Sequence, residues 1–401
     1  MKTTYLLLCL LGIGSVSGAG QTKQPQKIGD FIESTSYNEH RRNATRSLQY
    51  TPDGDDFVCI NGKNRFTRAL YGSHTAFRLE TSDRPVFAAY TKENPKHICF
   101  KLQTSGGTVA LDSTEHCESR YTAGRRSYSL SDPAFGGGSL SITTWALPDK
   151  EGAIWQFNAR NFKEFHPVLL ASISEIRNSK LNRNGDMGAD PADSFEAPLQ
   201  PQQLQSFPVQ IDGTLYILLE NQELRTLTTA EGENLFKKAE AARSETASRI
   251  RIETPDPYFN TLGGTLAMAA DGIWDGEVWL HGAIGWRMPL SGWRAAYTGD
   301  VLGWHDRART HFNAYAASQV TEVPNTFPHP AQDSALHLAR SVKKWGTPQY
   351  SNGYICRNPH RNNQMHHYDM NLCCIDELLW HFKWTGDLDY VRQMWPVITR
   401  H

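Results

Sequence analysis

The densest group of side chains with catalytic chemistry lies in one short, Gly-interrupted segment. Asp271, Asp275 and Glu277 alternate there with Trp274 and Trp279. Hydrolysis of a glycosidic bond needs one carboxylic acid to protonate the leaving oxygen and a second carboxylate to activate water or to attack. A carboxyl group beside indoles is partly desolvated, which raises its pKa and suits it to the acid role. We therefore predict that Glu277 and Asp275 are catalytic, although Asp271 and Asp275 could instead cap helices or form Asp-Gly turns.

Aromatic and arginine side chains near these carboxylates predict a sugar-binding surface. Indoles stack on the flat C–H faces of sugar rings, and a neighbouring arginine adds forked hydrogen bonds. The substrate-binding residues that we predict are Trp274, Trp279, His281, Trp286, Arg287, Trp293, Arg294, His366, His367 and Asp369. The alternative is that the tryptophans only fill a helical core, because aromatic residues dominate cores as well.

The remaining polar residues of this region indicate no cofactor. His360, His366 and His367 follow no spacing typical of a metal site, and the sequence holds no Cys-x-x-Cys pair. We therefore predict neither a metal nor another cofactor. Asp300 is interpreted as a helix cap, and Asp306 with Arg307 as a local ion pair.

The elements that must position these residues change character along the chain. From Phe57 to about Leu219, short apolar runs alternate with turns, which is typical of an antiparallel β-sandwich. Strands are expected at residues 57–60, 85–90, 97–102, 139–147, 153–157 and 214–219. A charged, Ala-rich segment at residues 229–252 then predicts a connecting helix, with Thr228 or Thr229 as its N-cap.

After Pro257 the apolar spacing becomes helical. Helices are expected at residues 260–270, 300–320, 370–385 and 388–399, with Pro396 bending or ending the last one. The domains that we predict are a signal peptide at 1–19, a leader at 20–55, a β-sandwich at 56–227, a linker helix at 228–254 and a helical domain at 255–401.

The N-terminus and the overall charge restrict the classes of function. Met1 and Lys2 precede an apolar run and then small residues up to Ala19, which is the order of a secretory signal peptide. We therefore expect an exported protein, periplasmic or secreted, with no stable membrane span. The 41 basic and 42 acidic residues form no basic stripe, so nucleic acid is not expected as a partner. Cys99 and Cys117 could pair, but buried free thiols are the favoured state.

In these residues the sequence resembles the six-hairpin glycosidases, whose catalytic domain is an (α/α)6 barrel often preceded by a β-sandwich. The segments Trp384-Thr385-Gly386-Asp387 and Met394-Trp395-Pro396-Val397 look like the helix–turn–helix that such barrels repeat. Within that group the chain is most similar to an uncharacterised family of exported bacterial proteins. The resemblance implies a β-sandwich followed by an incomplete (α/α) toroid, in a chain that is the N-terminal piece of a longer protein. By position, Glu277 or Asp275 matches the acid, and the base would follow His401.

The leading hypothesis is a glycoside hydrolase that cleaves an oligo- or polysaccharide outside the cytoplasm. A polysaccharide lyase is the nearest alternative, because Tyr368, His366 and Arg361 could supply a base and a cation for a uronate. Lyases usually place their helices before their sheets, and the order here is the reverse. A glycan-binding protein without catalysis is the third hypothesis, since fold does not establish function.

Overall fold

The computed structural model describes residues 50–63, 66–90, 96–162, 166–175, 203–282, 287–292, 295–322, 327–328, 344–345, 352–360 and 368–401. The signal peptide predicted at 1–19 and most of the leader predicted at 20–55 lie outside the described residues.

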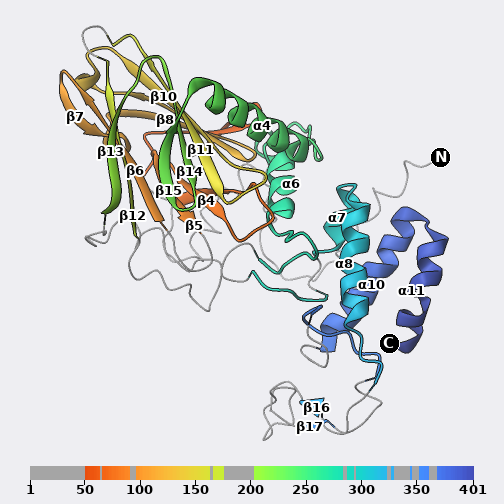
Figure 1. The fold of residues 1–401 in the computed structure, drawn as a ribbon. Coiled ribbons are helices and arrows are strands. Elements are labelled where there is room, and N and C mark those ends of the chain that lie inside the picture. The colour runs from red at the N-terminus through yellow and green to blue at the C-terminus, as the bar shows by residue number, and fades with distance from the viewer. Residues whose placement is uncertain are drawn as a thin grey trace, which may run out of the picture. The chain divides into compact units, whose positions relative to one another are not determined.

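Two antiparallel sheets form the part of the described chain between residues 51 and 227 (Figure 1). The larger sheet has the strand order β1-β2-β8-β9-β10-β11-β14-β15. Its strands are β1 (Thr51–Asp53), β2 (Asp56–Ile60), β8 (His116–Thr122), β9 (Arg125–Ser131), β10 (Ser139–Ala146), β11 (Gly152–Arg160), β14 (Thr214–Glu220) and β15 (Glu223–Leu227).

The second sheet has the order β13-β12-β6-β5-β4-β3, and β7 also pairs with β6. Its strands are β3 (Phe66–Leu70), β4 (Arg78–Ser82), β5 (Val86–Tyr90), β6 (Lys96–Thr104), β7 (Gly107–Ala110), β12 (Val168–Glu175) and β13 (Gln203–Gln210). The short 3-10 turn η1 (Leu111–Ser113) leads from β7 of the second sheet to β8 of the larger one, and η2 (Pro133–Phe135) lies between β9 and β10 of the larger sheet.

The sheets pack face to face because alternate side chains of their strands are apolar. On β8 every second residue is buried, beginning with Cys117, as expected where one face of a strand meets a core. Phe87 and Phe100 of the second sheet contact the Trp155 ring of β11 edge-on, with ring centroids 5.4 and 5.8 Å apart. One apolar core, containing side chains from both sheets, stabilises this half of the molecule.

Helix α4 (Thr229–Ala247) covers the outer face of the larger sheet and forms a third layer (Figure 1). Its N-terminus is a capping box, in which Thr228 and Glu231 each bond the other's backbone N–H. Gly232 touches the Tyr216 ring so closely that a Cβ there would lie 2.1 Å from it. Trp145 Nε1 donates a 2.7 Å hydrogen bond to Glu240. The sequence placed this helix and its cap correctly but extended it to residue 252.

The chain after residue 255 contributes a small set of helices and two short strands. The helices are α5 (Pro257–Asn260), α6 (Leu262–Gly272), α7 (Tyr297–Val301), α8 (His305–Ala317), α10 (Tyr368–Thr385) and α11 (Leu388–Arg400). The strands are β16 (Phe327–Pro328) and β17 (Lys344–Trp345). A second apolar core joins α6, α7, α8, α10 and α11 through side chains such as Ala267, Ala308, Phe312 and Leu378.

The fold class predicted from the sequence, a β-sandwich followed by an incomplete (α/α) toroid, is wrong. The described residues contain two antiparallel sheets and only a few helices, which form no helical ring. Within this part of the chain, α10 and α11 form one hairpin through Gly386, whose φ is +64°, while a short corner joins α7 to α8. Helical periodicity located most of these helices, but periodicity carries no information about how helices are arranged around one another.

Two further predictions concern the cysteines and the membrane. The six cysteines from Cys59 to Cys374 are free thiols, and Cys99 lies 3.0 Å from the Ser172 hydroxyl rather than against Cys117. In the part of the chain that the structure describes, every helix is too short or too polar to cross a bilayer.

Candidate functional site

Glu277 lies in a tight turn between two bridged tryptophans. Trp274 and Trp279 pair across the turn as an isolated antiparallel bridge, and Gly276 takes a φ of +99° that suits glycine. Asp275 Oδ1 accepts hydrogen bonds from the backbone N–H groups of Glu277 (3.0 Å) and Val278 (2.7 Å). Asp275 therefore fixes the turn, as Asp-Gly pairs commonly do, and leaves Glu277 as the projecting carboxylate.

The two indoles are buried and do not form a surface for sugar. Trp274 is 4% exposed and Trp279 1% exposed, and their ring centroids lie 4.7 Å apart in the second core. A Cβ on Gly299 of α7 would lie 2.3 Å from the Trp279 ring, so only glycine fits beneath it. A ring sealed in a core cannot stack on a ligand in this conformation, so the structure adds no support to the substrate-binding role predicted for both tryptophans. They anchor the turn that carries Glu277.

Glu277 meets His360 at the surface. His360 Nε2 lies 2.5 Å from Glu277 Oε2, and the two side chains are 68% and 42% exposed. The segment 352–360 is held by hydrogen bonds to the helices. Asn371 of α10 bonds both the N–H and the carbonyl of Ile355, and Cys356 N–H donates to Ser318. Both partners of the pair therefore sit on segments fixed by buried contacts.

A second polar cluster surrounds Asp271, at the C-terminal end of α6. Arg307 donates a 2.7 Å hydrogen bond to Asp271 Oδ1, and His74 Nε2 lies 3.4 Å from the same atom. Burial acts to raise the pKa of Asp271, but the hydrogen bonds from His74 and Arg307 and the Arg307 charge outweigh it and lower that pKa. Arg307 also covers the Trp304 ring at 4.3 Å. Arg307 thus pairs with Asp271. We had predicted a local ion pair with its neighbour Asp306 instead.

Arg287 joins the sheet region to α6. Its guanidinium donates to the backbone carbonyls of Gly272 (3.0 Å) and His74 (2.8 Å), and its burial lowers its pKa. The substrate-binding role predicted for Arg287 has no support here, since two donors of its fork are already used by the backbone.

Asp300 is buried inside α7 and bonds two histidines. Its Oδ1 lies 2.7 Å from His305 Nδ1 and 2.9 Å from His381 Nδ1. The prediction that Asp300 caps the following helix is wrong, because Trp304 occupies that position without a side-chain bond. His381 of α10 is 1% exposed, and its Nε2 has no hydrogen-bond partner among the described residues. No sequence pattern indicates the contact between Asp300 and His381, because the two residues lie 81 positions apart.

His311 of α8 forms a hydrogen bond to the backbone of the turn that carries Glu277. Its Nδ1 accepts a 3.1 Å hydrogen bond from Trp279 N–H. Burial lowers the pKa of His311 to about 3, so the imidazole stays neutral and keeps an acceptor nitrogen. Sequence reasoning missed His311, although it falls beside Phe312 on the face of α8 that also carries Ala308 and Tyr315.

Some of the other predicted site residues lie within the part of the chain that the structure describes, and the rest lie outside it. His281 is half-buried, and its N–H donates to the Met288 carbonyl at 3.0 Å. Asp369 lies in the first turn of α10. Trp286, Trp293, Arg294, His366 and His367 lie outside the described residues. Within the described ranges, no three His, Cys, Asp or Glu side chains come together in a way that could hold a metal ion.

Comparison with known proteins adds one similarity. Residues 95–249 match the model of a protein family described as "Domain of unknown function (DUF4450)". The match covers strands β6 to β15 and helix α4. It stops before the segment that carries Glu277. No curated protein matches the chain.

Proposed function

We propose that this protein is a glycoside hydrolase in which Glu277 donates the proton to the leaving oxygen. The observation that carries the proposal is the 2.5 Å contact between Glu277 and His360 at an accessible turn. General acid catalysis requires a proton donor that substrate can reach and that is held in one place. Glu277 meets both conditions, since its carboxylate is part-exposed and its turn is fixed by Asp275 and by two buried indoles.

His360 gives this carboxylate a proton partner. An imidazole within hydrogen-bond distance can pass a proton to Glu277 or take one from it, and it also orients the carboxylate. The pair can therefore act as a proton relay between solvent and a bound substrate. Asp275 is a positioning residue, because its oxygen is occupied by the turn's own backbone N–H groups.

The glycan substrate is supported by the acidic and aromatic sequence pattern and by the expected export of the chain, not by indoles in a cleft. Trp274 and Trp279 pack the interior, so sugar contacts must come from other residues around the turn.

The test is the Glu277→Gln variant of the full chain, assayed on a broad panel of plant and host glycans. Gln keeps the shape of the side chain but cannot donate the proton, so we expect kcat to fall by about 10²–10⁴-fold with little change in KM. His360→Gln should reduce kcat less, because water can still supply Glu277. Glu223→Gln changes an exposed carboxylate of β15 and should leave the rate unchanged.

Three outcomes would contradict the proposal. Unchanged turnover in Glu277→Gln removes this residue from the mechanism. An ultraviolet-absorbing unsaturated product indicates a lyase. No product from any glycan, together with retained binding, indicates a glycan-binding protein without catalysis.

A further inference from the structure

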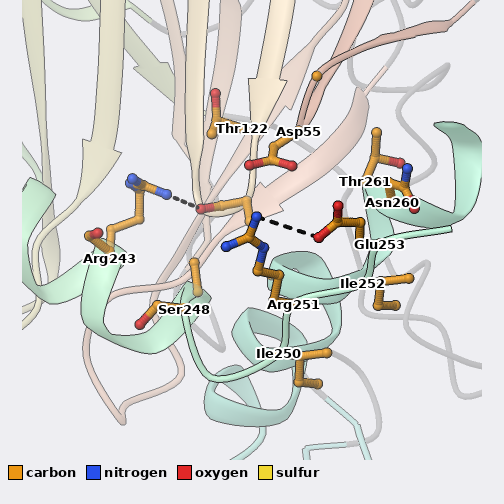
Figure 2. Close-up of a pocket in the computed structure, with 15 residues that line it drawn as sticks. Asp55, Thr122, Arg243, Ser248, Ile250, Arg251, Ile252, Glu253, Asn260 and Thr261 are labelled. Carbon is orange, nitrogen blue, oxygen red and sulfur yellow. Dashed lines mark hydrogen bonds and ion pairs between the residues drawn. The ribbon is translucent and has the colours of Figure 1, made fainter.

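A cavity in the described chain lies away from Glu277, between the larger sheet and the segment that follows α4 (Figure 2). Its volume is about 590 Å³, within the range of small-molecule sites. The β1–β2 turn and the end of β8 form one side, the end of α4 and residues 250–253 the second, and α5 and α6 the third. We call it the linker groove.

One wall of the linker groove is rigid. Arg243 of α4 donates to the Ala123 carbonyl at 2.9 Å and holds Glu240 through two further hydrogen bonds. On the opposite side, Asn260 is fixed by three hydrogen bonds to Thr254. Arg243 thus fixes α4 against the sheet side, and Asn260 fixes α5 against the segment that precedes it, so both sides of the groove are ordered without a ligand.

The groove is lined by two acidic and two basic side chains, so its formal charges cancel. Asp55 and Glu253 contribute carboxylates, and Arg243 and Arg251 contribute guanidinium groups. Figure 2 shows Arg251 and Glu253 turned toward one another, and their charged atoms lie 3.6 Å apart. Both of these side chains are exposed, so they can exchange this weak contact for bonds to a ligand.

This lining selects a neutral ligand rich in hydroxyl groups. A hydroxyl can donate to a carboxylate and accept from a guanidinium at once, and both partners are present. Ile250, Ile252 and Ala247 add aliphatic surface for C–H groups. An anion would meet Asp55 and Glu253 without an excess of positive charge to offset them. None of the described lining residues has an aromatic ring, so hydrogen bonds rather than ring stacking would hold the ligand.

We propose that the linker groove is a binding site for a neutral oligosaccharide. The site does not depend on the proposed chemistry at Glu277, because the groove contains neither Glu277 nor His360. It would hold a glycan at the junction between the sheets and the helices whether or not the protein cleaves it.

The test follows the methyl groups of Ile250 and Ile252 by NMR in the full chain, with both signals assigned from Ile→Val variants. The probes are maltotriose, cellotriose, mannotriose, xylotriose and, as an acidic comparison, trigalacturonate. We expect at least one neutral trisaccharide to shift both methyl signals in a saturable way. The double variant Arg251→Ala, Glu253→Gln should bind that sugar at least tenfold more weakly.

A matched control removes an exposed pair of a basic and an acidic side chain that lies on α4, outside the groove. Lys237→Ala with Glu233→Gln deletes a contact of 3.8 Å outside the groove and should leave the affinity unchanged. Glu277→Gln should also leave the methyl shifts unchanged, which separates this site from the proposed active site. The proposal is overturned if no neutral sugar moves the two methyl groups, if only trigalacturonate does, or if both double variants bind equally well.

Discussion

The two cores of this protein use titratable side chains differently. Between the sheets apolar side chains form one core, and this half also buries charged pairs, Arg126 with Asp83 and Arg78 with Glu80. In the helical region the indoles alternate with imidazoles and carboxylates, among them His311, His381 and Asp300. The family match lies mainly in the first region, and the candidate catalytic pair lies in the second.

This difference indicates a division of labour. An apolar core gains stability from burial alone and is indifferent to pH, whereas a core with neutral imidazoles and bonded carboxylates depends on their protonation states. The two regions should therefore respond to acid through different buried groups, imidazoles in the helical region and the carboxyl group of Asp83 in the sheet region. The predictions below test this comparison, in order of decreasing effect.

The largest effect should come from removing one buried indole from each core. Trp155→Ala and Trp279→Ala should each cost about 3–5 kcal/mol, because each leaves a large cavity. Trp279→Ala should loosen the helices and spare the strands, and Trp155→Ala should destabilise the strands directly. Hydrogen exchange of the strand and helix amides, measured in both variants, distinguishes the two effects. Equal loss of strand protection in both would mean that the two cores unfold as one.

The second prediction concerns acid pH in the helical core. Burial lowers the pKa of His311 to about 3, so between about pH 6.5 and 3 the unfolded chain binds a proton that the folded protein does not. Stability contributed by this group is lost as the pH falls through that window, by at most about 1.4 kcal/mol per pH unit. His311→Asn keeps an acceptor for Trp279 N–H and should flatten this slope in urea unfolding measured from pH 7 to 4.

In the sheet region, Asp83 should change the free energy of unfolding with pH in the opposite direction to His311. Burial raises its pKa to about 6 against the opposing charges of Arg126 and Arg84. The folded protein then binds the extra proton between about pH 6 and 4, so stability from this group rises as the pH falls through that window. Asp83→Asn should therefore steepen the acid loss that His311→Asn reduces. If both substitutions change the slope in the same direction, the contrast between the two cores is wrong.

The smallest effect tests to which region α4 belongs. Thr228→Ala removes the capping box and should cost about 1 kcal/mol. Because α4 packs on the larger sheet, the loss should appear in the exchange of strand amides and not in that of α10 and α11. Thr214→Ala, which removes a side-chain bond to Asn158 elsewhere on the same sheet, provides a comparison of similar size.

Local pattern was enough to predict much of the sheet region. The strands expected at residues 139–147 and 214–219 correspond closely to β10 and β14, and Thr228 caps α4 as predicted. These features depend on periodicity and capping between residues close in sequence, which a single chain displays directly.

The candidate site was less accessible to sequence reasoning. Glu277 and Asp275 were singled out, whereas the turn role of Asp275 and the core burial of Trp274 and Trp279 had been only the alternatives to a catalytic and a sugar-binding role. The partners His360 and His74 lie 83 and 197 positions from the residues they contact. Such contacts are set by tertiary packing, which leaves no periodic trace in the sequence, and the arrangement of the helices was missed for the same reason.

The cover that α4 provides has a practical consequence for dividing this protein into parts. A chain that stops at residue 227 would bare the outer face of β10, β11 and β14, where Trp145, Ile154 and Tyr216 pack beneath the helix. That surface would drive self-association during heterologous expression. A chain that continues to residue 249, where the family match also stops, includes α4 and keeps that face covered. We expect this length, and not the one that ends at residue 227, to give soluble protein.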